Sequence, residues 1–183
     1  MDVINTSLPE VLLIKPKIFK DSRGFFLESW NSARYEEIGL PEIFLQDNIS
    51  YSEHGVLRGL HFQEPNAQGK LISVLKGDIF DVAVDIRLGS PRFGKWVGLT
   101  LTADTHHQIW IPPGFAHGFL VTSPTALVSY KSSAFYSPET EGTVLWNDPA
   151  LNIIWPLSNP NLAEKDMKAP PLSQIPQSKL PKF

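Results

Sequence analysis

Hydrophobic and polar side chains alternate along much of the chain, and a period of two is typical of β-strands. In residues 79–86, apolar side chains fill every second position from Phe80 to Ile86, while Asp81 and Asp85 fall on the other face. A strand before this one is separated from it by a turn at residues 76–78. Further strands are predicted at residues 56–63, 96–104, 107–111, 118–123 and 125–133.

Short stretches rich in glycine and proline separate these strands, at residues 88–94, 112–114 and 122–125. Many short strands divided by such turns predict an antiparallel sandwich or barrel. One helix is expected over residues 31–40, because Asn31 or Ser32 suits its start and Gly39 its end.

The residues from Pro156 onward hold six of the sixteen prolines and predict an irregular arm, with one helical turn at residues 161–167. We therefore expect a single domain over residues 1–183, with a core at about 9–155 and a C-terminal arm at 156–183.

Composition narrows the class of protein. Hydrophobic residues make up 42% and charged residues 19%, as in ordinary globular domains, and no apolar run is long enough to span a membrane. The net charge of −3 without a basic block disfavours a nucleic-acid partner. The first residues lack a basic start and an apolar run, so no secretory signal is predicted. The absence of cysteine excludes disulfides and a thiol nucleophile, and it fits a cytoplasmic protein.

The strand at residues 56–63 carries two side chains that an apolar strand does not need, Arg58 and His61. Strict alternation places them on opposite faces. A lone histidine is usually a satisfied core or rim residue, but the nearby arginine and the space left by Gly59 favour a site.

The other histidines give no metal-binding pattern. His106 and His107 are adjacent, so on a strand they point to opposite faces and make a poor ligand pair. His54 precedes a glycine and is expected in an exposed turn, and His117 could be structural or could contact a ligand. We predict no metal site and no cofactor.

Several other polar residues have ordinary explanations when each is taken alone. Lys70 and Arg23 fit turns, residues 46–48 fit a polar loop, Tyr130 fits the edge of a core and Asp166 fits an exposed position.

Several longer stretches of the sequence, taken together, are characteristic of one protein family. Residues 21–30, 46–63, 67–98, 109–121, 130–151 and 162–170 read DSRGFFLESW, QDNISYSEHGVLRGLHFQ, AQGKLISVLKGDIFDVAVDIRLGSPRFGKWVG, IWIPPGFAHGFLV, YKSSAFYSPETEGTVLWNDPAL and LAEKDMKAP. In this order they closely resemble the dTDP-4-dehydrorhamnose 3,5-epimerase family, from about Pro9 to Pro171.

The resemblance implies an all-β, cupin-type double-stranded β-helix (a jelly roll) with short helices, used without a metal in a cytoplasmic homodimer. It implies epimerisation of dTDP-4-dehydro-6-deoxy-D-glucose to dTDP-4-dehydro-L-rhamnose, for cell-surface polysaccharide. His61 matches the family's base, Asp166 its carboxylate partner and Tyr130 its general acid. Lys70 and Arg58 match cations near the reacting sugar. The positions that match the rest of the nucleotide-sugar site are Arg23, Glu28, Gln46, Asp47, Asn48, His117, Glu141 and Lys165.

This chemistry requires the residue types found here. A proton alpha to the C4 ketone must be removed, the resulting enolate stabilised, and the carbon protonated from the opposite face. Histidine is suited to the first task, a cation to the second and a protonated tyrosine to the third. Two alternatives stay open: an epimerase that acts at C3 or C5 only, and a sugar-binding barrel without catalysis.

Overall fold

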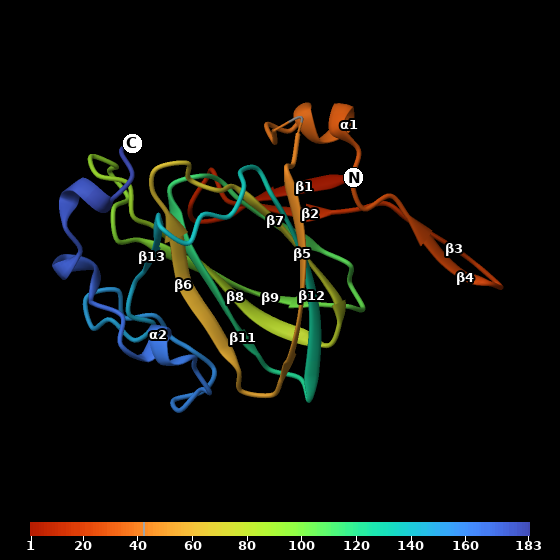
Figure 1. The fold of residues 1–183 in the computed structure, drawn as a ribbon. Coiled ribbons are helices and arrows are strands. Elements are labelled where there is room, and N and C mark those ends of the chain that lie inside the picture. Colours follow the sequence, from red (N-terminus) through yellow and green to blue (C-terminus); the bar gives the residue numbers. More distant parts are fainter. Residues whose placement is uncertain (42) are drawn as a thin grey trace.

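The computed structural model describes residues 1–41 and 43–183, and strands dominate it (Figure 1). The strands are β1 (Asp2–Asn5), β2 (Leu12–Lys15), β3 (Ile18–Asp21), β4 (Gly24–Leu27), β5 (Gln46–Glu53), β6 (Leu57–Gln63), β7 (Lys70–Lys76), β8 (Asp78–Asp85), β9 (Trp96–Thr102), β10 (Gln108–Ile111), β11 (Phe115–Val121), β12 (Thr125–Ser132) and β13 (Glu141–Thr143). The helices are α1 (Ser32–Glu36) and α2 (Glu164–Met167), with 3-10 turns η1 (Leu172–Gln174) and η2 (Gln177–Lys179). No helix in the described residues has the length and apolar character needed to cross a membrane.

Two antiparallel sheets face each other and enclose the main core. One has the order β1-β2-β10-β7-β12-β5 and the other β13-β6-β11-β8-β9. Ile72 and Val128 of the first sheet pack with Ala83 and Phe119 of the second in one buried cluster. The turn predicted at residues 76–78 is present, and it passes the chain from the first sheet to the second. This is the cupin-type jelly roll.

The alternation predicted for residues 79–86 is confirmed, because both faces of β8 are buried in different clusters. Ile79 and Ala83 lie in the inner core, whereas Val82 and Val84 pack on the outer side. Because the side chains on both faces of β8 are covered, each of them is buried or half-buried.

The C-terminal arm covers the outer face of the five-stranded sheet. Leu172, Ile175 and Leu180 of the arm are buried against Val82 and Val84 (Figure 1, blue). The helical turn predicted within residues 161–167 is present as α2. The arm therefore runs close to β6, and this brings α2 to the edge of the sheet (Figure 1).

The predicted helix near residue 31 is present but shorter than expected. Asn31 is its N-cap, and the Asn31 side chain accepts a hydrogen bond from the Arg34 N–H. Gly39 follows the helix with a φ of +87°, in the region that favours glycine.

Residues 46–48, expected in a polar loop, instead begin β5, and that expectation was wrong. The strand alternates strictly, but its apolar side chains Ile49 and Tyr51 are exposed, and its inward side carries only polar residues, namely Gln46, Asn48, Ser50 and Ser52. The start of this strand could not be recognised from hydrophobic alternation, because the inner side of β5 faces a polar cavity and not the apolar core.

The β3–β4 hairpin projects away from the barrel (Figure 1). Its aromatic side chains Phe19, Phe25 and Phe26 are 52%, 57% and 70% exposed. Large apolar side chains are rarely displayed so openly without a partner surface.

Candidate active site

A cavity of about 570 Å³ opens between the two sheets, next to α2. Strands of both sheets and the arm line it. The cavity brings together most of the predicted site residues: Gln46, Asn48, Arg58, His61, Lys70, His117, Tyr130, Glu141, Lys165 and Asp166.

His61 and Asp166 form a hydrogen-bonded pair. His61 Nε2 lies 2.7 Å from Asp166 Oδ1, and the Gly59 N–H donates to Asp166 Oδ2 at 3.2 Å. The carboxylate side chain is 2% exposed, so the exposed position expected for Asp166 was wrong. Burial acts to raise the pKa of Asp166, but its contacts with His61, Gly59 and Lys165 hold that pKa below its ordinary value. Because Nε2 faces the carboxylate, Nδ1 is the ring nitrogen left for a ligand.

A register shift in β6 brings Arg58 to the same cavity as His61. His61 pairs with His117 and Arg58 with Phe119, so two residues of β6 lie opposite one of β11. This extra residue reverses the alternation, and the expectation that Arg58 and His61 lie on opposite faces was wrong.

Gly59 lies within this shift and has a φ of +118°. A Cβ there would lie 2.6 Å from both Gly118 Cα and the His117 carbonyl oxygen. Glycine is therefore required for the two strands to approach, not for access of a ligand.

Lys70 and Tyr130 come from the six-stranded sheet, opposite His61. Ile72, next but one to Lys70 on β7, pairs with Tyr130 on β12. Burial lowers the pKa of Lys70 to about 8, against the opposing charges of Glu141 and Asp81. Burial raises the pKa of Tyr130, so its phenol is protonated at neutral pH. One sheet thus presents an imidazole and the other a phenol and an ammonium group.

A second histidine–carboxylate pair lies deeper in the cavity. His117 Nε2 lies 2.9 Å from Asp81 Oδ2, and both side chains are buried. The other oxygen of Asp81 is buried without a hydrogen-bond partner among the described residues. Asp81 was noticed in the sequence only as part of an alternating strand.

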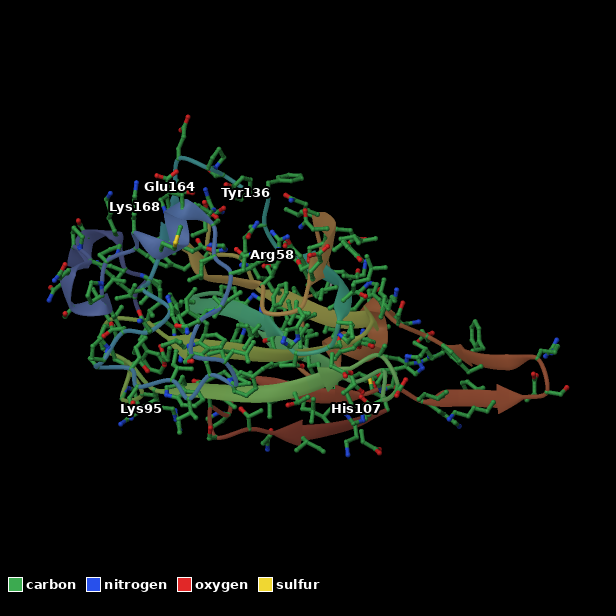
Figure 2. All side chains as sticks on the ribbon, turned by 90° about the horizontal axis from the view of Figure 1, so that it is seen from below. Arg58, Lys95, His107, Tyr136, Glu164 and Lys168 are labelled. Carbon is green, nitrogen blue, oxygen red and sulfur yellow. The ribbon has the colours of Figure 1, made fainter. Side chains whose placement is uncertain are left out.

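The outer part of the cavity is polar. Lys165 Nζ lies 2.8 Å from Glu141 Oε2, and the Tyr136 hydroxyl donates to the same oxygen at 3.3 Å. Gln46 donates to Asn48 Oδ1 at 2.9 Å and accepts from the Tyr136 N–H at 2.8 Å. Tyr136 was missed in the sequence, where nothing distinguishes it from a surface tyrosine. Arg58 and Tyr136 lie on the same side of the molecule as Glu164 and Lys168 of the α2 region, opposite Lys95 and His107 (Figure 2).

Three of the predicted site residues lie outside the cavity. Arg23, at the tip of the β3–β4 hairpin, is 87% exposed and pairs with Asp21. Glu28 binds Arg34, and Asp47 binds Lys131 on the outer side of the six-stranded sheet.

Over residues 1–41 and 43–183, no group of three or more histidine, aspartate or glutamate side chains is placed to hold a metal ion. His54 is exposed, as expected for a turn, and His106 packs against the Phe25 ring instead of pairing with His107.

The jelly roll and the groups on its two inner walls define an isomerase-type enzyme, equipped to remove a proton from one side of a ligand and supply one to the other. Comparison with known proteins gives the family. The model of the dTDP-4-dehydrorhamnose 3,5-epimerases matches residues 5–174, and the chain belongs to this family.

Relatives cover nearly the whole chain. The dTDP-4-dehydrorhamnose 3,5-epimerase of Salmonella typhimurium is 54% identical over 95% of this chain and 97% of its own length. The enzyme of the same name from Neisseria gonorrhoeae is 51% identical over 98% of this chain, but the chain spans only 55% of that relative. The crystal structure of the Legionella pneumophila dTDP-6-deoxy-D-glucose-3,5-epimerase with dTDP-4-keto-L-rhamnose is 51% identical, with a TM-score of 0.97 over 100% of this chain and 98% of that one.

Proposed function

We propose that this chain epimerises dTDP-4-dehydro-6-deoxy-D-glucose at C3 and C5 to give dTDP-4-dehydro-L-rhamnose, in the cytoplasm and without a metal or cofactor. One observation supports this most directly: His61 and Tyr130 come from opposite sheets and line the same cavity. Inversion of a carbon needs a base and an acid on opposite faces of the sugar ring, and this arrangement supplies them.

His61 is the base in this proposal. Its Nδ1 takes the proton on the carbon alpha to the C4 ketone, while Nε2 donates to Asp166. The buried carboxylate fixes the tautomer and stabilises the imidazolium that forms. The C–H electron pair moves into the ring as an enolate, whose charge resides on the C4 oxygen.

Lys70 stabilises that oxygen. It lines the cavity opposite His61, and no hydrogen bond or ion pair of its ammonium group is found among the described residues. A cation whose pKa is lowered to about 8 is still mostly charged at neutral pH. Because it is already buried, little further water must be removed when it contacts the enolate oxygen.

Tyr130 donates the proton that completes inversion. Its phenol O–H bond breaks as a new C–H bond forms on the face opposite His61. The same groups act on C3 and C5, since both carbons are alpha to the ketone.

The outer part of the cavity suits the nucleotide. Lys165 is a cation for the diphosphate, and Gln46 and Asn48 offer amide groups to the thymine ring of the nucleotide. Tyr136 adds an aromatic ring on which a pyrimidine can stack. Lys165 and Asp166 belong to the arm, so residues 1–183 act as one domain.

The functional unit in this proposal is a homodimer. Arg23 and Glu28 match nucleotide-sugar positions, yet in their own chain they lie outside the cavity. The exposed aromatic hairpin and the exposed Ile49, Tyr51 and Leu75 provide apolar surface for a second copy. The hairpin of one protomer would then deliver Arg23 to the other protomer's cavity.

Mixed dimers test this arrangement. We expect an Arg23→Ala chain and a His61→Ala chain each to be inactive as homodimers. If the hairpin acts in the partner's site, the mixed dimer contains one intact site and regains close to half of the wild-type activity per dimer. No recovery in a mixed dimer confirmed by native mass spectrometry would show that Arg23 does not act across the interface.

Product NMR after incubation with the 4-keto sugar nucleotide tests the function itself. Inversion at both carbons supports the proposal, inversion at one supports a mono-epimerase, and no turnover supports a sugar-binding barrel. The assay is repeated after exhaustive chelation and dialysis, where we expect unchanged turnover. Restoration of a lost activity by zinc or iron would overturn the metal-free mechanism.

A further inference from the structure

The Arg58 side chain links the two sheets at the side of the cavity. It starts on β6 of the five-stranded sheet and reaches β5, the edge strand of the six-stranded sheet. Arg58 Nε donates to Ser52 Oγ at 3.0 Å, and Nη2 donates to the Tyr51 carbonyl oxygen at 3.4 Å. The guanidinium is thereby fixed on one edge, and its other N–H groups have no hydrogen-bond partner among residues 1–41 and 43–183.

Ser52 is suited to hold this arginine. It is 5% exposed and lies on the inward side of β5, the same side as the cavity residues Gln46 and Asn48. Ser50 lies between Asn48 and Ser52 on that side, and its hydroxyl oxygen is buried without a partner among the described residues. Of these two serines on one strand face, Ser52 binds the guanidinium and Ser50 does not.

The charge of Arg58 acts on Tyr130. Both side chains line the cavity, and Tyr130 lies on β12, directly beside β5 and paired with Asn48. Burial raises the pKa of Tyr130, and the positive charge of Arg58 opposes that rise. When Tyr130 gives up its proton, the electron pair of the O–H bond remains as a phenolate in a partly buried place. A fixed cation nearby stabilises that phenolate and the transition state that leads to it.

We propose that Ser52 is a positioning residue, which holds the Arg58 guanidinium where it supports proton donation by Tyr130. This inference rests on the proposed function and deepens it. His61 removes a proton without help from Ser52, whereas inversion depends on Ser52 through Arg58 and Tyr130. After each inversion the phenolate regains a proton from solvent, and the His61 imidazolium releases one.

The experiment measures inversion and proton exchange together. Wild-type, Ser52→Ala, Ser52→Thr and Ser50→Ala chains are incubated with the 4-keto sugar nucleotide in heavy water. NMR gives the rate of deuterium entry at C3 and C5 and the rate of inverted product. For Ser52→Ala we expect inversion to fall about tenfold, the rate equivalent of one charge-assisted hydrogen bond. Deuterium entry with retained configuration and KM stay near the wild-type values.

Three comparisons separate this role from a structural one. Ser52→Thr keeps the hydroxyl and restores the ratio of inversion to exchange. Ser50→Ala removes a hydroxyl from the same strand face and leaves the ratio unchanged. In a Tyr130→Phe background, Ser52→Ala causes no further loss of the residual inversion, because the group through which it acts is gone.

Two results would overturn the inference while wild-type turnover supports the proposed function. One is a Ser52→Ala chain whose exchange and inversion fall by the same factor. The other is a raised KM with unchanged kcat, which would make Arg58 a substrate-binding group alone. A wild-type chain that neither exchanges nor inverts would instead refute the proposed function.

Discussion

Asp166→Asn changes one atom of the pair proposed to set up the base. Asp166 accepts two hydrogen bonds, from Gly59 N–H and from His61 Nε2. An asparagine offers only one acceptor, and the fixed backbone N–H of Gly59 retains it. The amide NH2 then faces Nε2, which must carry a lone pair, so the ring proton moves to Nδ1. The nitrogen that faces the cavity can no longer accept a proton.

The loss of the Asp166 negative charge determines how far kcat should fall in Asp166→Asn. His61 Nε2 and Asp166 Oδ1 are 2.7 Å apart, and the carboxylate side chain is 2% exposed. With charge centres about 4 Å apart and an effective dielectric constant of about 20, the imidazolium is stabilised by roughly 4 kcal/mol. This corresponds to nearly 10³-fold in rate. We therefore expect kcat to fall by about 10³-fold, with the wrong tautomer adding to the loss.

Turnover is followed by NMR, and the Kd for dTDP is measured by calorimetry. The Kd should change little, since the charge behind His61 matters after binding, when imidazolium forms. Glu164→Gln is the matched control: it makes the same carboxylate-to-amide change on α2, at a side chain that is 76% exposed. A weaker Kd with unchanged kcat would refute this reasoning and make Asp166 a ligand contact.

Four further changes test other groups. His61→Asn should abolish both inversion and deuterium entry at C3 and C5, and near-normal deuterium entry by NMR would identify another base. Tyr130→Phe should lose most of the doubly inverted product while at least one alpha proton still exchanges, and wild-type inversion would exclude it as the acid. Because the pKa of Lys70 is lowered to about 8, kcat should fall as the pH rises through 8 and the ammonium is lost; in Lys70→Gln this alkaline fall should be absent from the pH profile. Gly59→Ala should lower the free energy of unfolding in urea by roughly 3 kcal/mol, because its Cβ would meet the backbone of β11, and an unchanged midpoint would show that β6 can shift.

The sequence predicts well those elements whose pattern is decided locally. Strands β8 to β12 and the capped helix α1 follow from alternation, turns and the Asn31 cap. Strand β5 escapes this reasoning because its polar side faces the cavity and its apolar side faces outward. Whether an alternating strand faces core, cavity or solvent depends on what packs against it, which is a tertiary property.

The candidate site shows the same division. Arg58 and His61 are recognisable as unusual in an apolar strand, but the register shift that joins them in one cavity depends on how β11 pairs with β6. The burial of Asp166 also needs the arm to fold back across 105 residues. The resemblance to a family supplied these roles, since spacing in the sequence carries no signal for either contact.

That separation of His61 from Asp166 has a consequence during protein synthesis. A ribosome completes β6 and most of the barrel well before the arm leaves its exit tunnel. In the growing chain, His61 therefore lacks its partner Asp166, although β6 and the neighbouring strands have already been synthesised. Only when the arm has been made and packs on the five-stranded sheet does Asp166 reach His61, so the proton-transfer pair forms after the barrel that carries its histidine.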